Sequence, residues 1–491
     1  MDPRTPVLVG VGQLNQRVDR GEPALEPAAL MAEALRRAAG DAGAPGLLGA
    51  ADSIRTVALL SWRYRNPGAV VATLLGIDPA DTAVSAMGGN SPQSLVNTTC
   101  LDILEGRAET VLLAGAEAWR TRTAARDDDV KLDWTVEPEG APPARLLGAD
   151  VDMNHRSELG RGVMMPVQVY PLFEQALRHA SDLDDRAHRT RISELWSRFS
   201  EVAASNPNAW IQKAFSAEVI ATAGPDNRMV GYPYTKLMNS NNAVEQSAAL
   251  ILTSVERAES LGVDRDRWVF PLAGTDARDH VYLSERADLH SSPAIRHASR
   301  ACLDLGGVGV DDLAHVDLYS CFPSAVQIGA NEIGLPLDRQ LTVTGGLSFA
   351  GGPWNNYVMH AIATMADVLR ADPGSIGLCT ANGGYTTKHA FGLYSTEPAA
   401  EGFRHASPQD AVDALPRRTI AADYAGPATL ESHTVMHDRE SRPEIAIAAV
   451  LTPEGGRGWA TSTDDDVKAT LVGNDLIGDS VTVDADGALR L

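Results

Sequence analysis

The first part of the chain alternates short apolar runs with segments of helical periodicity. Val7–Val11 is an apolar run that predicts a strand, and Leu25–Ala39 repeats apolar residues on one side of a predicted helix. Three further strands are predicted over residues 54–60, 82–86 and 110–116, and a helix is predicted over residues 91–104. The strand at 110–116 is apolar throughout, which is typical of a strand in the middle of a sheet. This pattern predicts a layered α/β domain.

The pattern changes between residues 119 and 244 and then starts again. Charged and proline-rich pieces precede two helical stretches, 171–178 and 192–204, which predicts a mostly helical inserted segment. From residue 268 the α/β alternation returns. Its predicted elements are a strand over 270–273, a helix over 294–305 and a strand over 316–319.

Two glycine-rich turns stand at matching places in the two α/β parts. Gly88-Gly89-Asn90 is followed by a helix and a strand, and Gly351-Gly352-Pro353 is followed by a helix and a strand as well. The shared order predicts an internal duplication. We therefore expect a first half over residues 1–255, with the insertion at about 119–244, and a second half over 256–400.

Beyond residue 401 the chain becomes β-rich. Apolar runs over 429–436, 444–451 and 481–483 are separated by Gly, Asp and Pro turns, which predicts a separate small β-domain over 401–491. Its size suits a barrel of the oligonucleotide/oligosaccharide-binding (OB) type or a small sandwich, because periodicity does not distinguish the two. The acidic run at 464–466 disfavours a nucleic-acid face.

Composition narrows the class of protein. With 42 Lys and Arg against 64 Asp and Glu, the formal charge of −22 repels phosphate backbones, so we expect no nucleic-acid partner. No stretch approaches the ~18 apolar residues of a membrane span. The four cysteines are too scattered for a disulfide framework or a zinc site, so we expect no metal site and a location in the reducing cytoplasm. They are Cys100, Cys302, Cys321 and Cys379. We also expect no bound cofactor.

Four segments carry a resemblance to a known family. They are Met87–Ser91, Tyr319–Phe322, Gly345–Pro353 and Leu378–Gly384. In order and setting they resemble four signatures of the thiolase superfamily, over about residues 5–398. The sterol-carrier-protein-type thiolases and the thiolase-like proteins are the most similar members. The resemblance implies a duplicated, five-layered αβαβα fold with a helical loop domain.

The resemblance also implies that two catalytic groups have been replaced. Gly89 stands at the position of the family's nucleophilic cysteine, and Gly352 at that of the histidine base. Glycine can neither form an acyl-thioester nor take up a proton. Tyr319 replaces the polar residue that leads the family's oxyanion-hole signature. Ordinary thiolysis is therefore not expected.

Cys379 is the one main catalytic group that the resemblance retains, as the acid/base cysteine. A cysteine that ends an apolar strand is also typical of an inert, buried thiol, and both interpretations stay open. The remaining pocket residues implied by the four signatures are Gly88, Asn90, Ser91, Phe322, Gly345, Gly346, Ser348, Asn382 and Gly383. An alternative is that these glycines only shape sharp turns.

The resemblance implies coenzyme A or an acyl-CoA as ligand or substrate. One reading is an acyltransferase, nominally an acetyl-CoA acetyltransferase, with altered chemistry in lipid metabolism. The alternative is a non-catalytic acyl-CoA or acyl-carrier binding protein that recruits a partner enzyme through its C-terminal β-domain. Family members pair as homodimers through the strand before position 89, but an added domain could block that edge and leave a monomer.

Overall fold

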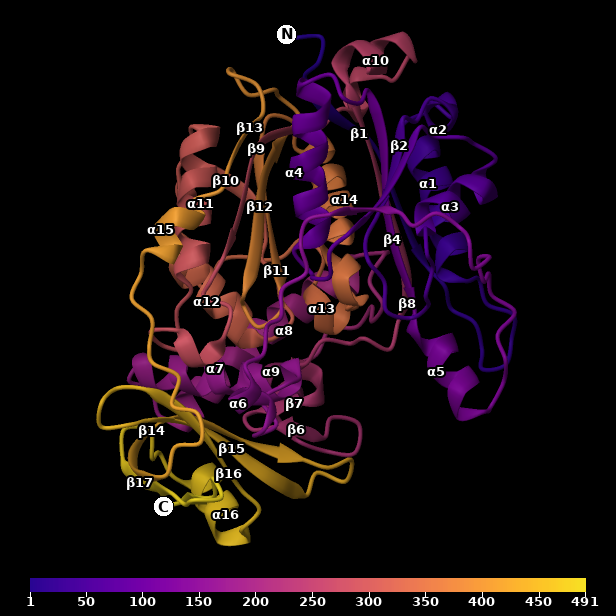
Figure 1. Ribbon diagram of the computed structural model, residues 1–491. Coiled ribbons are helices and arrows are strands. Elements are labelled where there is room, and N and C mark those ends of the chain that lie inside the picture. Colours follow the sequence, from indigo (N-terminus) through magenta and orange to yellow (C-terminus); the bar gives the residue numbers. More distant parts are fainter.

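Two sheets face each other in the computed structural model, which describes residues 1–491 (Figure 1). In spatial order, the first sheet comprises β1 (Pro6–Asn15), β8 (Glu245–Ser254), β4 (Thr110–Ala118), β2 (Ser53–Thr56), β3 (Asp81–Ser85) and β5 (Arg145–Leu147). The second comprises β10 (Leu313–Asp317), β11 (Ile376–Gly383), β12 (Lys388–Ser395), β9 (Phe270–Arg278) and β13 (Arg404–Ala406).

The two sheets repeat one strand order. The series β1-β8-β4-β2 corresponds to β9-β12-β11-β10. In both series the first two pairings are antiparallel and the third is parallel. The duplication predicted from the glycine turns is therefore confirmed at the level of topology.

Helices fill three layers around the sheets. The middle layer is α4 (Ser91–Leu104) and α14 (Tyr357–Ala371), which contact both sheets (Figure 1). The outer helices are α1 (Pro27–Asp41) and α3 (Pro67–Leu75) on the first sheet, and α11 (Pro293–Gly306) with its neighbour α12 (Pro323–Ile333) on the second. A helix between two sheets needs apolar residues on several sides, and α14 supplies them. The expected five layers are confirmed.

Residues 119–244, the expected loop domain, contain mostly helices. Its elements are α5 (Trp119–Asp127), α6 (Arg156–Leu159), α7 (Pro166–Ala180), α8 (Asp185–Ser205), α9 (Ala217–Ala221), β6 (Met229–Gly231) and β7 (Tyr234–Thr235). Short helices also lie elsewhere, among them α2 (Gly46–Gly49), α10 (Val255–Ser260) and α13 (Gly346–Phe349). No helix is long and apolar enough to span a membrane.

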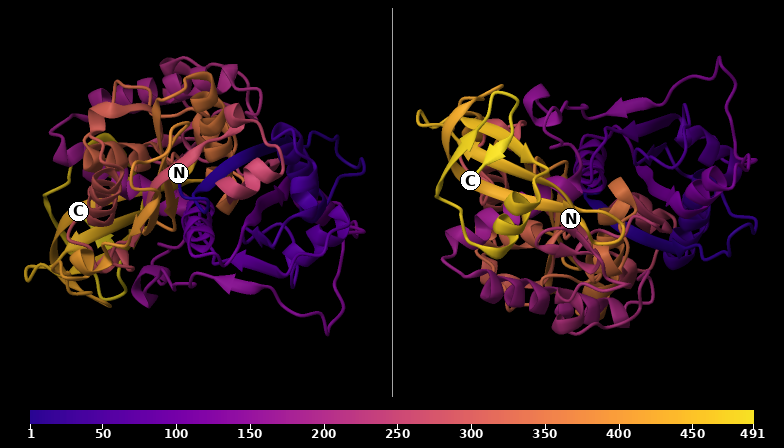
Figure 2. Two further views of the ribbon diagram at one scale, coloured as in Figure 1. Left: turned by 90° about the horizontal axis from the view of Figure 1, so that it is seen from above. Right: turned by 90° about the horizontal axis from the view of Figure 1, so that it is seen from below.

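The C-terminal sheet is shared with the loop domain. Its strands are β14 (Gly426–His437), β15 (Pro443–Leu451), β16 (Arg457–Ser462), β17 (Ser480–Val483) and β18 (Leu489–Arg490). Strand β6 of the loop domain joins this sheet through the pair Met436↔Gly231. From above and below, the sheet lies on the side of the second half, away from β1–β5 (Figure 2). An isolated bridge between β16 and residue 488 curls it toward a barrel, and an OB topology stays a prediction.

Two details of the C-terminal region differ from the sequence interpretation. Strand β13 pairs with β9, and α15 (Gln409–Asp413) follows it, so residues 404–406 extend the second half beyond residue 400. The acidic run opens a helix, α16 (Asp465–Gly473). The Asp464 side chain accepts hydrogen bonds from the amides of Asp466 and Val467, and acidic residues in a first helical turn favour the helix dipole.

The edge of β3 is already occupied. Strand β5 pairs with β3 in parallel, with Ala83 opposite Arg145 and Ser85 opposite Leu147. A paired edge cannot accept a strand from a second copy. The covering strand comes from the insertion, and not from the added C-terminal domain as the sequence suggested.

A buried arginine fixes the C-terminal sheet to the second half. Arg457 is 0% exposed and forms a two-pronged ion pair with Glu431. Its Nη1 also donates to the carbonyls of Leu283 and Arg286, both at 2.6 Å. Every donor of this guanidinium that faces the interface therefore has an acceptor, which is what a buried charge requires.

Replacing this arginine tests how the domain is held. Arg457→Met leaves Glu431 without its counter-ion, so we expect the free energy of unfolding to fall by about 3–5 kcal/mol. Chemical denaturation and hydrogen exchange over residues 426–488 measure the effect. Arg442→Met is the matched control, because the Arg442 side chain is 74% exposed in its ion pair and should cost under about 0.5 kcal/mol. Equal free energies of unfolding for the two variants would contradict the role of Arg457 in holding the C-terminal sheet.

Candidate functional site

A cavity of about 340 Å³ lies where the loop domain meets both halves. Three of the four predicted catalytic positions, Gly89, Tyr319 and Gly352, line it together. No Asp, Glu, His, Lys or Arg is among its lining residues. No group of three or more His, Cys, Asp or Glu side chains in the protein is placed to hold a metal ion. The site offers neutral hydrogen-bonding groups and apolar surface.

Tyr319 takes the space that a side chain at position 89 would need. A Cβ atom built on Gly89 would lie 2.9 Å from Cζ of Tyr319, still closer to its hydroxyl, and 2.5 Å from the carbonyl oxygen of Asn382. Real Cβ atoms do not approach other heavy atoms so closely. A cysteine at this position is therefore incompatible with the present place of Tyr319.

The strand end after β10 sets the orientation of Tyr319. Its amide donates to Oγ1 of Thr380 at 2.9 Å, and its ring packs edge-on against Tyr357, with 5.6 Å between ring centroids. The hydroxyl donates to no acceptor in the protein, and burial raises the pKa of the phenol well above 10. Tyr319 is therefore a neutral, unpaired hydrogen-bond donor at physiological pH.

The position of the family's base faces a loop of the first half. A Cβ atom on Gly352 would lie 3.1 Å from Oδ1 of Asn242 and 3.4 Å from Cβ of Ser240. The Gly352 amide also donates to the carbonyl of Asn241 at 2.9 Å. Loop 239–242 therefore forms the wall against which an imidazole would have to pack.

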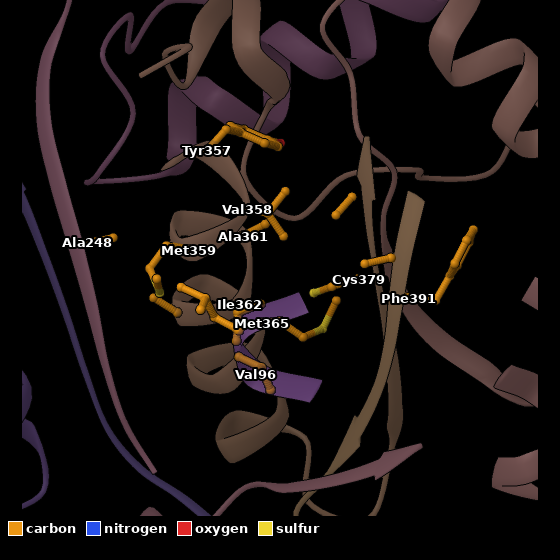
Figure 3. Close-up of a cluster of buried hydrophobic side chains, with 14 of the residues drawn as sticks. Val96, Ala248, Tyr357, Val358, Met359, Ala361, Ile362, Met365, Cys379 and Phe391 are labelled. Carbon is orange, nitrogen blue, oxygen red and sulfur yellow. The ribbon is translucent and has the colours of Figure 1, made fainter. Parts of the chain in front are cut away.

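Cys379 does not line the cavity. Its side chain is 0% exposed and points into the apolar layer around α14, beside Val358 and Met365 (Figure 3). Burial raises the pKa of this thiol well above 9. The residue of β11 that approaches Gly89 is Asn382, three positions further, or about 10 Å along a strand. This geometry favours the inert, buried alternative over an acid/base role.

Cys321 is the thiol that lines the cavity, and the sequence interpretation passed over it. The side chain is 7% exposed, and burial raises its pKa to about 12. The next residue, Phe322, stacks on Tyr170 with 4.5 Å between centroids and also lines the cavity. The signal was available, because Cys321 lies two residues after Tyr319 in the second signature.

The other predicted pocket residues divide into two groups. Gly88, Phe322 and Asn382 line the cavity. The remaining six lie outside its lining: Asn90, Ser91, Gly345, Gly346, Ser348 and Gly383.

Several of the second group shape the turns around the cavity. The Ser91 hydroxyl donates to the carbonyl of Ala86 at 2.7 Å, and that of Ser348 donates to the carbonyl of Asn239 at 2.9 Å. Gly345 has φ of 100°, and a Cβ there would lie 2.6 Å from the backbone of Ala203. Gly345 thus fits the alternative that the signature glycines shape sharp turns.

Methionines supply much of the apolar wall, and only Met87 of them lies in a signature segment. Met87, Met153, Met164 and Met165 all line the cavity. The last two are 48% and 42% exposed, so they also reach solvent. Methionine is flexible and polarizable, so a wall of this kind adapts to apolar ligands of different shape.

Comparisons with known proteins agree with this architecture. Residues 408–488 match the family described as the thiolase-like protein type 1 additional C-terminal domain. The crystal structure of a monomeric SCP2-thiolase-like protein type 1 (STLP1) from Mycobacterium smegmatis is similar with a TM-score of 0.83. It is 33% identical, over 99% of this chain and 97% of that chain. No protein among those of curated function matches this chain.

Two further structures share the fold at lower identity. An Ltp2-ChsH2(DUF35) aldolase has a TM-score of 0.61 and 18% identity, over 80% of this chain and 98% of that chain. The dimeric peroxisomal thiolase of Saccharomyces cerevisiae has a TM-score of 0.57 and 14% identity, over 81% of this chain and 98% of that chain. These two similarities concern the fold alone.

Thiol labelling of the native protein tests the placement of the cysteines. We expect methyl methanethiosulfonate to modify Cys321 at least about tenfold faster than the three cysteines that are 0% exposed, because those need local opening. Peptide mapping by mass spectrometry identifies the labelled residue. Cys321→Ala should abolish the fast phase, and Cys379→Ala is the matched control that should retain it. Fast labelling of Cys379 would contradict its burial.

Proposed function

Since this chain belongs to the SCP2-thiolase-like proteins of type 1, we propose that it binds an acyl thioester, such as an acyl-coenzyme A, without forming a covalent acyl-enzyme. The acyl carbonyl lies against the Tyr319 hydroxyl, and the acyl chain lies along the methionine wall. One observation carries the proposal. The unpaired phenol of Tyr319 stands in the space that the nucleophile's side chain would need.

Backbone amides add further hydrogen-bond donors to the cavity lining. The amides of Gly88 and Gly89 donate to no acceptor in the protein, and both residues line the cavity with Tyr319. Preorganised donors stabilise a carbonyl oxygen more strongly as negative charge develops on it. These groups support polarisation of a thioester carbonyl, as acyl transfer or carbon–carbon bond formation without a covalent intermediate requires.

Ordinary thiolysis needs two groups that this site lacks. The nucleophile must be a thiolate, and a neighbouring base must take its proton. Position 89 has no side chain, and loop 239–242 lies where the base would pack. We therefore do not expect acetyl-CoA acetyltransferase activity of the thiolytic kind, although the site resembles that of the enzymes that have it.

A non-catalytic binding role is the second candidate. The lining has no carboxylate, imidazole or amine, and burial raises the pKa of Tyr319 and of Cys321, to about 12 for the latter. No lining group thus exchanges a proton near neutral pH, which favours binding over turnover. In this case the C-terminal domain would recruit a partner enzyme, and native co-purification with mass spectrometry would identify it.

We also propose that the protein works as a monomer. The edge of β3, through which family members pair, is covered by β5 of the same chain. The similar protein from Mycobacterium smegmatis is described as monomeric.

Restoring the cysteine alone should not restore a thiolase. In Gly89→Cys the new side chain meets Tyr319 and the carbonyl of Asn382, so we expect a lower melting temperature and no acylation. Intact-mass spectrometry after incubation with acetyl-CoA, and a thiolysis assay, measure the outcome. Gly89→Ala separates the steric effect from the chemistry. A mass increase of one acyl group on the cysteine variant would overturn the steric argument.

Removing the phenol hydroxyl should weaken acyl-CoA binding. We expect Tyr319→Phe to lose about fivefold to tenfold in affinity, the size of one hydrogen bond of about 1 kcal/mol, with little change for free coenzyme A. Because burial raises the pKa of Tyr319 above 10, the donor stays protonated, and wild-type affinity should be flat from pH 6 to 9. Isothermal titration calorimetry measures both. Absence of acyl-CoA binding by the wild type would refute the proposed function.

A further inference from the structure

We infer that the acyl group carries a hydroxyl near its carbonyl, and that Asn242 accepts the hydrogen bond from that hydroxyl. The inference rests on the acyl-thioester binding proposed above and names the class of substrate, a hydroxyacyl thioester. It assigns to Asn242 a specificity role that depends on this chain's own loop 239–242.

The side chain of Asn242 makes no hydrogen bond that would stabilise the fold. Its carboxamide makes no hydrogen bond with any protein group, and its Oδ1 is buried without a partner. The residue lines the cavity, and its Oδ1 lies 3.1 Å from the point where a side chain at position 352 would begin. A buried acceptor without a partner destabilises the fold unless a ligand or an ordered water satisfies it. The position of the lost base therefore carries an acceptor instead.

Two neighbouring carboxamides present the same atom. Oδ1 of Asn239 and Oδ1 of Asn382 are also buried and unpaired, and both residues line the cavity. Their orientation is fixed at the other end of each amide. Nδ2 of Asn239 donates to the carbonyl of Thr235 at 2.7 Å, and Nδ2 of Asn382 donates to Oη of Tyr170 at 3.0 Å. The oxygens are thus left as acceptors.

The loop that carries Asn242 is held in place. The Asn241 amide donates to the carbonyl of Leu347 at 3.0 Å, and the Ser240 hydroxyl donates to the carbonyl of Cys321 at 3.1 Å. Both bonds tie the loop to the second half, next to the cavity wall. Asn242 is therefore presented on rigid backbone, as specific recognition requires.

The cavity as a whole offers donors and acceptors but no charge. The Tyr319 hydroxyl and Nε1 of Trp354 are unpaired donors, which suit a carbonyl oxygen. The unpaired oxygens need a donor from the ligand. An ammonium group would enter without a counter-ion, which is costly, whereas a hydroxyl is a neutral donor on an acyl chain. The amides of a pantetheine arm are the other neutral source of N–H donors.

Three ligands separate these sources: a 3-hydroxyacyl-CoA, the saturated acyl-CoA of the same chain length, and free coenzyme A. By calorimetry we expect the wild type to prefer the hydroxyacyl-CoA over the saturated one by about fivefold to tenfold, the size of one hydrogen bond. Asn242→Leu, which keeps the volume and removes the acceptor, should abolish that preference by weakening hydroxyacyl binding alone. Asn241→Leu is the matched control, because Asn241 is adjacent but does not line the cavity, and it should retain the preference.

The outcomes separate this inference from the proposed function. Equal wild-type affinity for the two acyl-CoAs would overturn the hydroxyl assignment and leave acyl binding intact. A preference that survives in Asn242→Leu would overturn the role of Asn242. Equal weakening of all three ligands in that variant would assign the contact to the pantetheine arm and also overturn the inference. Binding of none of them by the wild type would refute acyl-CoA binding itself. Asn242→Ala provides the same comparison if the leucine variant does not fold.

Discussion

The site is organised by a steric exclusion between position 89 and the phenol of Tyr319. A Cβ atom at position 89 would lie 2.9 Å from Cζ of Tyr319 and 2.5 Å from the carbonyl oxygen of Asn382, so a side chain there requires both the phenol and the end of β11 to move. This chain carries the Tyr319 hydroxyl where a side chain at position 89 would stand. The consequence extends to the charge of the cavity, because a site without a nucleophile needs no base. Its remaining polar groups are neutral donors and acceptors, which is the kind of lining that the proposed binding of an acyl carbonyl requires.

The duplicated scaffold around the cavity positions the segments that line it. The turn before α4, the segment after β10 and the end of β11 come from both halves, and the duplicated topology brings them together. The loop domain closes the cavity with methionines, and the C-terminal sheet shares strand β6 with that domain. Buried Arg457, paired with Glu431 of the same sheet, then fixes the sheet to the second half through the carbonyls of Leu283 and Arg286. The C-terminal domain therefore contacts the loop domain, which forms part of the cavity wall.

Local pattern was enough for most of the fold, and it failed where long-range contacts decide. The helix over 91–104 begins and ends as its periodicity predicts. The strand expected over 54–60 ends at Thr56, because only residues 53–56 pair with β3 and β4. In the sequence, the acidic run at 464–466 was interpreted only through its negative charge. In the structure it begins α16, with Asp464 as the N-cap residue. Cys379 matched a signature by spacing, yet the pleat of β11 turns its thiol into the core.

The sequence by itself determined the duplication and the family, and it put glycine at the positions that correspond to the family's nucleophile and base, because periodicity, glycine turns and residue identity are local properties. Only the tertiary structure decided which side chains surround those two glycines. Tyr319, Cys321 and Asn242 come from segments far from Gly89 in the chain, and which side chains face one cavity depends on how the halves pack. Strand pairing across the fold likewise decided that the insertion covers the edge of β3. Such contacts leave no periodic signal in the sequence.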